Sequence, residues 1–257
     1  MRPIEELTAE IEAARAALHS AKKIVVLTGA GISTDSGIPD FRGPEGLWTK
    51  NPEAEKTATL SSYVSDPELR KRNWQRLAEG SMWEGKAPNP GHRALVELEH
   101  QGRLHTLITQ NVDGLHRAAG TSEERLVEIH GTTSKVRCLD CGDTALMEFA
   151  LERVRAGEAD PPCRICGGIL KSATISFGQN LVMADLHRSE QAAMSCDVML
   201  AVGSTLTVYP IANVVPIAHQ AGAEVVIVNA EPTPFDGLAV AVVPASISEA
   251  LPLIVAQ

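Results

Sequence analysis

Residues 23–33 read Lys23-Ile-Val-Val-Leu-Thr-Gly-Ala-Gly-Ile-Ser33. The four aliphatic residues that follow the lysine form a run typical of a strand buried on both faces. Gly29 and Gly31 permit a tight turn in which backbone N–H groups can approach a pyrophosphate, with a helix N-terminus behind them. Thr34 stands where the dinucleotide-binding pattern has its third glycine, and no strand ending in an acidic residue follows about twenty positions later. The turn alone therefore leaves open both a nucleotide site and an ordinary connection from a strand to a helix.

Aliphatic runs of the same kind recur along the chain and alternate with segments of helical periodicity. Ile4, Leu7 and Ile11 begin a series of apolar residues that predicts an amphipathic helix over residues 4–18. Strands that alternate with helices are typical of a parallel sheet covered on both faces, so we predict an α/β fold. The further strand-like runs are 104–109, 126–129, 198–203, 225–229 and 239–243, and the further helical segments are 91–100, 183–194 and 211–221.

Two segments interrupt this alternation. Residues 39–90 contain no strand-like run, are rich in proline, glutamate and lysine, and hold all three tryptophans. Residues 133–171 hold four of the five cysteines and show little sheet pattern. We therefore predict that both segments are insertions into the α/β core.

The composition excludes several classes of protein. With 257 residues, 44% of them hydrophobic and 21% charged, the chain matches a globular protein rather than a disordered, coiled-coil or collagen-like one. Its net charge of −9 argues against non-specific nucleic-acid binding, which needs a basic face. Glutamates interrupt the first twenty residues, unlike a signal peptide, and no apolar run approaches the ~20 residues of a membrane span. We expect a cytoplasmic protein with no nucleic-acid or membrane partner.

Four of the five cysteines form two pairs with the spacing of metal ligands. Two residues separate Cys138 from Cys141 and Cys163 from Cys166, and a glycine follows each pair. The glycine lets each loop curl so that N–H groups face the thiolates, and two such hairpins supply four sulfurs to one tetrahedral zinc ion. Because protein ligands would fill all four positions, we predict a structural zinc. Cys196 precedes a predicted strand and is expected to be a small buried residue.

Polar residues follow several predicted strands at their carboxyl ends. Gln110, Asn111 and Asp113 follow the run 104–109, and His130 follows the run 126–129. Ligands of open parallel α/β sheets bind outside the carboxyl ends of the strands, so these residues predict a binding site there. Each also has a structural interpretation, because an aspartate can cap a helix and a histidine or asparagine can form a turn. The clusters after the later strands are Gly203, Ser204 and Thr205, and Asn229 with Ala230.

Taken together, these motifs resemble a known family. Gly29-Ala-Gly-Ile-Ser-Thr-Asp-Ser-Gly-Ile-Pro-Asp-Phe-Arg42 is followed, in order, by Thr109-Gln-Asn-Val-Asp113, His130-Gly131, the four cysteines and Gly203-Ser-Thr205. The set resembles the catalytic core of the sirtuins, which are NAD-dependent protein-lysine deacylases, and the bacterial type in particular. The resemblance extends from about residue 23 to the end of the chain.

The resemblance implies an architecture within one catalytic core, residues 1–257. A Rossmann-like parallel sheet with helices on both faces would be formed by residues 20–132 and 172–257. Residues 39–90 would form a helical and cofactor-loop insertion, and residues 133–171 a small zinc-binding domain of the zinc-ribbon type. NAD and the acyl-lysine of a protein substrate would meet in the cleft between the large and small domains, and each chain would hold one structural zinc.

The resemblance also implies roles for individual residues. In the family the acyl oxygen attacks the ribose carbon as nicotinamide leaves, and a histidine then takes a proton from a ribose hydroxyl. The products are free lysine, nicotinamide and O-acyl-ADP-ribose. His130 matches this base, because imidazole titrates near neutral pH, and Asn111 matches the residue that orients the ribose or a water. The residues matched to NAD binding are Gly29, Ala30, Gly31, Ile32, Asp40, Phe41, Arg42, Gln110, Asn111, Asp113, Gly203, Ser204, Thr205, Asn229 and Ile247.

The chain departs from the family's pattern at three of its positions. Gln179 follows Phe177-Gly178 where the family commonly has Phe-Gly-Glu, in a loop that borders the acyl-peptide. Thr205 replaces the commoner serine but keeps the hydroxyl. Ile247 stands where a small residue is expected beside adenine.

Acyl preference is a further expectation from the resemblance. Sirtuins that favour succinyl groups carry a Tyr-x-x-Arg pair on the helical insertion, and alignment places Trp74 and Leu77 at those positions. Arg76 is one residue off, which turns a helical side chain by about 100°. We therefore predict deacetylation rather than removal of acidic, succinyl-type groups.

Three other functions compete with deacetylation. The same NAD site could serve a mono-ADP-ribosyltransferase or a catalytically silent NAD-binding scaffold, and a zinc ribbon could bind nucleic acid. The complete set of Gln110, Asn111, Asp113 and His130 favours the deacylase. Nucleic-acid binding is disfavoured by the acidic charge and by the lack of an aromatic platform near the cysteines.

Overall fold

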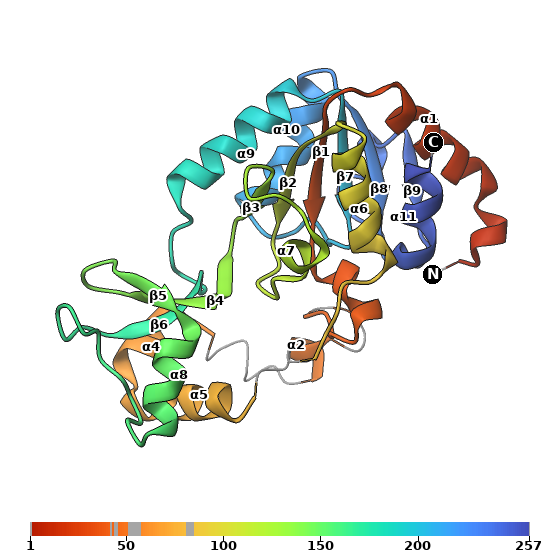
Figure 1. The fold of residues 1–257 in the computed structure, drawn as a ribbon. Coiled ribbons are helices and arrows are strands. Elements are labelled where there is room, and N and C mark those ends of the chain that lie inside the picture. The colour runs from red at the N-terminus through yellow and green to blue at the C-terminus, as the bar shows by residue number, and fades with distance from the viewer. Residues whose placement is uncertain (1, 42, 44–45, 51–57, 81–84, 257) are drawn as a thin grey trace.

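The computed structural model describes residues 2–41, 43, 46–50, 58–80 and 85–256. It has a large part built on a parallel sheet and a smaller part built on an antiparallel sheet (Figure 1). The termini lie on the large part, on the side of the sheet away from the small part. Among the described residues, no helix has both the length and the apolar character that crossing a membrane demands.

The large part has the strand order of a Rossmann fold. Its six strands lie in the order β3-β2-β1-β7-β8-β9, and each pair of neighbours is parallel. This confirms the predicted Rossmann-like α/β fold. The order reverses between β1 and β7, where a crevice for a ligand opens in folds of this kind. The strands are β1 (Ile24–Thr28), β2 (Leu104–Thr109), β3 (Leu126–Glu128), β7 (Val198–Val202), β8 (Glu224–Val228) and β9 (Ala241–Val243).

Helices bury both faces of this sheet. Ile24 and Val26 of β1 pack with α1, α6 and α11, and Val25 and Leu27 pack on the opposite face with α9 and α10. Two buried faces explain why these strands are continuously aliphatic in sequence. The helices are η1 (Ile4–Glu6), α1 (Thr8–Ser20), α6 (Pro90–His100), α7 (Leu115–Ala119), α9 (Met183–Ser195), η3 (Ile211–Asn213), α10 (Val214–Gln220), η4 (Asp236–Leu238) and α11 (Ile247–Val255).

The smaller part combines a three-stranded sheet with helices from elsewhere in the chain. The sheet has the order β5-β4-β6, and both pairings are antiparallel. Its core contains Trp74 from α5 together with Val136, Met147 and Leu151. The buried ion pair between Arg70 and Asp160 (2.9 Å) further ties α5 to this part. The elements are β4 (Gly131–Cys138), β5 (Thr144–Leu146), β6 (Leu170–Thr174), α4 (Leu60–Ser65), α5 (Pro67–Glu79) and α8 (Met147–Arg155).

Two features add to the sequence predictions. Residues 133–171 show little sheet pattern in sequence, yet they contain β5, most of β4 and the first two residues of β6. Most residues of β4 and β5 are half-buried or exposed, so they need not be apolar. The sequence predicts a helix behind the glycine turn without specifying its type, and the structure has a 3-10 helix there, η2 (Ala30–Ser36). Gly37 ends η2 in the left-handed region with φ +77°, and α2 (Leu47–Lys50) follows.

Candidate active site and metal centre

The glycine turn is packed directly against the loop that follows β7. Gly31 N donates to Gly203 O at 2.8 Å. A Cβ on Gly29 would lie 2.6 Å from Gly203 O, and one on Gly203 would lie 2.5 Å from Ile32 N. Only residues without a side chain allow the two loops to approach this closely. The glycines therefore bring the ends of β1 and β7 together at the point where the strand order reverses.

The loop after β2 is held to the glycine turn by side-chain hydrogen bonds. Asn111 is buried, and its Nδ2 donates to Gly29 O (3.1 Å) and Ser33 Oγ (3.3 Å). Ser33 Oγ donates to Asp113 Oδ2 (2.7 Å), and Asp113 Oδ1 accepts from Leu115 N (2.9 Å) at the start of α7. The predicted residues Asn111 and Asp113 thus fix this loop, and Asp113 also caps a helix.

His130 lies where β3 leads into β4. Its Nδ1 contacts Gln110 O at 3.1 Å, and because a carbonyl can only accept, Nδ1 carries the proton and Nε2 is left as a lone-pair acceptor. Burial lowers the pKa of His130, and the hydrogen bond to Gln110 O partly opposes this shift. The side chain is therefore neutral at neutral pH and has one nitrogen available to take a proton.

The remaining polar residues of the strand ends connect three strands. Gln110 Nε2 donates to Ser204 Oγ at 2.8 Å, which joins the end of β2 to the end of β7 across β1. Asn229, at the end of β8, is buried and donates to Glu231 O at 2.7 Å. Thr205 Oγ1 lies 2.9 Å from Thr207 Oγ1. The carboxyl edge of the sheet therefore presents a continuous row of amide and hydroxyl groups.

A cleft of about 1780 Å³ runs along this edge and extends to the small part. It brings together most of the predicted residues, whereas Ile32 and Asp113 lie behind its wall and Arg42 falls outside the described residues. Asp40 accepts a hydrogen bond from Gly43 N at 3.0 Å and faces the same cleft. The predicted residues in its lining are Gly29, Ala30, Gly31, Asp40, Phe41, Gln110, Asn111, His130, Gly203, Ser204, Thr205, Asn229 and Ile247.

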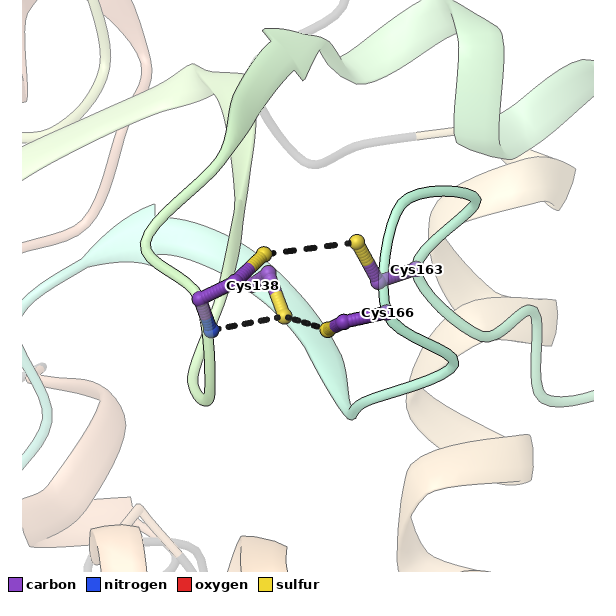
Figure 2. A group of neighbouring side chains, drawn as sticks. Cys138, Cys163 and Cys166 are labelled. Carbon is purple, nitrogen blue, oxygen red and sulfur yellow. Dashed lines mark hydrogen bonds between the residues drawn. The ribbon is translucent and has the colours of Figure 1, made fainter.

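The four paired cysteines converge in the small part, away from this cleft. Their sulfurs all lie within 4.8 Å of one another, with Cys138 and Cys166 at 3.5 Å and Cys141 and Cys163 at 3.7 Å (Figure 2). Four sulfurs around a tetrahedral zinc at 2.3 Å would be about 3.8 Å apart, so the cluster fits the ion. The backbone amide of Cys141 lowers the pKa of the Cys138 thiol to about 7, which favours the thiolate that binds a metal.

Cys196 is not part of this cluster. It is buried before β7, and its environment raises the pKa of the thiol to about 11. This confirms its prediction as a small buried residue.

The comparisons with known proteins agree with this geometry. A model described as the Sir2 family matches residues 29–210, which span the glycine turn, the cysteines and the loop after β7. The chain belongs to the Sir2 family, the sirtuins.

Two curated relatives and one solved structure illustrate the match. An NAD-dependent protein deacetylase 2 of Streptomyces coelicolor is 46% identical over 89% of this chain and 95% of its own. An NAD-dependent protein deacylase 2 of Archaeoglobus fulgidus is 40% identical over 96% of each chain. A structure of Sir2 with a p53 peptide and NAD+ superposes with a TM-score of 0.81, at 30% identity, covering 96% of this chain and 95% of that one.

Two of the residues at which the chain departs from the sirtuin pattern, Gln179 and Ile247, are held by contacts with neighbouring residues. Gln179 Oε1 accepts from Ser176 N at 3.1 Å, so it closes its own loop while it lines the cleft. Ile247 begins α11 and packs against α6, where a Cβ on Gly91 would lie 3.0 Å from its Cγ2. Its bulk is therefore accommodated on the core side, with one edge in the cleft.

The helix expected to select the acyl group is oriented differently from our prediction. Trp74 is only 1% exposed and fills the core of the small part instead of facing the cleft. Leu77 does line the cleft, but so do Asn73 and Arg76. The expectation that Arg76 points away from the sirtuin cleft is therefore wrong, because α5 presents residues 73, 76 and 77 to it.

Several residues that hold the site together carry little or no signal in the sequence. Ser33 joins Asn111 to Asp113, and Asn89 Nδ2 donates to Ile32 O (2.7 Å) while its Oδ1 caps α6 at Gly91 N (2.9 Å). Thr133 Oγ1 donates to Val112 O at 2.8 Å. For Asn89, the signal was an asparagine just before a proline at a helix start, which is typical of an N-cap. For the others no local signal exists, since each partner lies far away in sequence.

Proposed function

We propose that this sirtuin is an NAD-dependent protein-lysine deacetylase. The observation that carries the proposal is His130, a neutral imidazole with a free Nε2, in the same cleft as the glycine turn and the strand-end amides. Relatives that match nearly the whole chain are named NAD-dependent protein deacetylases and deacylases. The substrates would be acyl-lysine side chains of proteins.

The proposed roles follow from the positions in the cleft. When bound, NAD supplies an electrophilic ribose carbon that accepts the acyl oxygen as nicotinamide leaves. The turn at Gly29 and Gly31 would bind its phosphates through backbone N–H groups, and Ser204 and Asn229 would bind the adenosine side. Asn111, held by Gly29 O and Ser33 Oγ, would orient the ribose. His130 Nε2 would take a proton from a ribose hydroxyl.

The architecture suits this assignment of roles. We propose that residues 20–132 and 172–257 form the NAD-binding large domain, that residues 39–90 form a helical and cofactor-loop insertion, and that residues 133–171 form a small domain that holds a structural zinc. The donor set supports NAD, because amide and hydroxyl groups of Gln110, Asn111, Ser204 and Asn229 line the strand ends near the glycine turn. The sulfur geometry supports zinc, with Cys138, Cys141, Cys163 and Cys166 as its ligands.

The test combines one wild-type assay with one variant. Zinc-loaded protein is incubated with NAD and an acetyl-lysine peptide, and nicotinamide release and peptide mass are followed. We expect the peptide to lose about 42 mass units, the difference between an acetyl group and the hydrogen that replaces it, in step with the release of nicotinamide. His130→Ala should lower the rate by roughly two orders of magnitude or more, the usual size of a general-base contribution, while NAD still binds.

Each alternative gives a different result in this assay. Nicotinamide release with a gain in protein mass, and no change in the peptide, would indicate an ADP-ribosyltransferase. NAD binding with no nicotinamide release would indicate a silent scaffold. A His130→Ala variant with full activity would contradict the role proposed for the imidazole.

A further inference from the structure

Lys171 is a buried lysine on β6 that the proposed reaction does not use. It is only 4% exposed, although it borders the cleft. Its Nζ donates to Thr174 O (2.5 Å), Ser172 O (3.2 Å) and Thr174 Oγ1 (3.3 Å). An ammonium group has three N–H donors, so each can find an acceptor within the next three residues of the chain. The side chain therefore curls over the end of its own strand and clamps it.

The charge of Lys171 is balanced by neutral oxygens. In the part of the chain that the structure describes, no carboxylate forms an ion pair with it, and burial lowers the pKa of its ammonium to about 8. A buried cation without a carboxylate is costly, and an apolar side chain would fill the same space at less cost. Compared with an apolar residue at the same position, Lys171 contributes these three hydrogen bonds.

The strand end that Lys171 clamps is in contact with His130. Ile175 N, the next donor along the chain, donates to His130 O at 2.7 Å. Thr174 pairs with Gly131, and a Cβ on Gly131 would lie only 2.0 Å from Ala173 O. Beyond Thr174 the chain continues along the cleft to Gln179. A shift of Thr174 would thus move both the backbone of His130 and one wall of the cleft.

We propose that Lys171 is a positioning residue for the deacylation, whose ammonium fixes the end of β6 and, through it, His130 and the segment 175–179. The inference rests on the proposed function. Among the described residues, no hydrogen bond joins the glycine turn, Ser204 or Asn229 to Lys171 or Thr174, so NAD binding should not depend on the clamp. The acyl-peptide side of the cleft should depend on it.

The charged groups around Lys171 allow its titration to be recognised. Arg137 faces it across the β4–β6 ladder, and Glu128 of β3 and Asp185 of α9 line a second cavity with it, of about 100 Å³. Guanidinium groups and carboxylates do not titrate near pH 8. In the main cleft, burial lowers the pKa of His130 and raises the pKa of Tyr63, both away from this range. The clamp should be nearly complete well below pH 8 and should weaken as the pH rises through about 8.

The experiment compares three variants of the zinc-loaded chain. Lys171→Met removes the donors, Lys171→Arg keeps a charge that persists above pH 8, and Lys135→Met is the matched control, an exposed lysine on the adjacent strand β4. Steady-state rates are measured with an acetyl-lysine peptide and with NAD between about pH 6.5 and 9.5. Binding of a fluorescent acetyl-lysine peptide and of NAD is measured separately, together with zinc content and thermal stability.

We expect Lys171→Met to lower kcat/KM for the peptide by about tenfold or more, with KM for NAD unchanged. Lys171→Arg should restore most of the rate at pH 7 and move the alkaline decline of kcat/KM to higher pH. Lys135→Met should behave as the wild type. If Lys171→Met does not fold, the pH profile of Lys171→Arg decides the question.

Several outcomes would overturn the proposal. One is wild-type kinetics in Lys171→Met, and another is an alkaline decline that Lys171→Arg shares with the wild type. Equal losses of NAD and peptide binding would show a general structural role instead. A wild type that binds the peptide but releases no nicotinamide would contradict the proposed function itself, and a change in peptide affinity on Lys171→Met would still report on the clamp.

Discussion

His130 combines a fixed tautomer with a lowered pKa. The hydrogen bond from Nδ1 to Gln110 O leaves Nε2 free, and burial disfavours the imidazolium form. A base that is already neutral at the working pH needs no prior deprotonation. The environment of this one side chain therefore prepares it for proton transfer before any substrate arrives.

The acid limb of the pH profile tests this environment. A lowered pKa means that His130 becomes protonated only at a pH below its ordinary value, so kcat/KM should persist as the pH falls through about 6.5. We expect the half-maximal point of the acid limb to lie below that value in wild-type protein. An acid limb centred above pH 6.5 would contradict the assignment, and the residual activity of His130→Ala should lack this limb.

We expect the side chains that α5 presents to the cleft to decide acyl preference. Leu77 in the cleft offers no partner to a carboxylate, and Arg76 is exposed, so water and salt screen its charge. We expect acetyl-lysine to be cleaved faster than succinyl-lysine in the same peptide, because a desolvated carboxylate without a partner costs several kcal/mol. Any residual desuccinylation should fall in Arg76→Leu and not in the control Arg72→Leu, and faster desuccinylation would overturn the prediction.

At this scale, some residues could be predicted and others could not. The cysteines and His130 stand out because their chemistry and spacing are local properties of the sequence. Ser33 and Lys171 do not, since a serine in a turn or a lysine on a short strand is ordinary until its partner is known. Ser33 meets Asp113 across 80 positions of the chain, and no periodicity records such a contact.

The junction between β3 and β4 depends on one glycine for two independent reasons. Gly131 has φ +75°, a conformation that other residues adopt only at a cost, and it faces the backbone of β6 at a distance that excludes a side chain. The strand pair β4–β6 can start beside His130, the proposed base, only because position 131 has no Cβ. The junction between β3 and β4 therefore lies at the proposed active site.

Comparing Gly131→Ala with Gly157→Ala should separate the cost of a positive φ from the cost of a clash with the backbone of β6. Gly157 also has a positive φ, +101°, but a Cβ there would meet nothing within 4 Å. We expect Gly157→Ala to cost about 1–2 kcal/mol of stability with activity intact. Gly131→Ala should cost more and should also reduce kcat, because β6 must move away from His130. Equal effects on kcat would contradict this account.

The more deeply the residues of a strand are buried, the more readily that strand could be predicted from the sequence. The strands of the large sheet are aliphatic on both faces, so their runs identify them in sequence, as for Val198–Val202. Most residues of the small sheet's strands are half-buried or exposed. Many of them are polar, so these strands form no aliphatic run that could be recognised in the sequence. A helix was expected behind the glycine turn, and the structure has the short 3-10 helix η2 there, in which Gly31 N donates to Gly203 O and which Gly37 ends.

The whole molecule contains separate hydrophobic cores of very different size. The two faces of the large sheet are packed by dozens of buried side chains. The core of the small part has, among the residues that the structure describes, eight buried ones, two of them cysteines of the metal cluster. A core that small does not by itself outweigh the entropy of ordering the chain. The zinc ion is expected to supply the difference, since structural zinc contributes folding energy.

Removal of zinc tests whether the small part needs the metal to fold while the large part does not. We expect a strong chelator, or Cys163→Ser, to abolish activity and to disorder the small part while the parallel sheet remains folded. Circular dichroism should retain most of the helical signal, zinc analysis should fall from one equivalent toward zero, and NAD binding should weaken less than peptide binding. Cys196→Ser is the control, because this thiol lies outside the cluster. Full activity without zinc would refute the prediction.

The central position of β1 and β7, each flanked by strands on both sides, has a consequence for how the chain is degraded. Their amides should exchange with solvent deuterium only when the whole sheet unfolds, whereas those of β4 and β6 should exchange whenever the zinc ion leaves. Proteases cut chains that open locally, so the first cleavages should fall in the small part. The lifetime of the intact polypeptide, and with it the supply of active protein, is then expected to follow the availability of zinc.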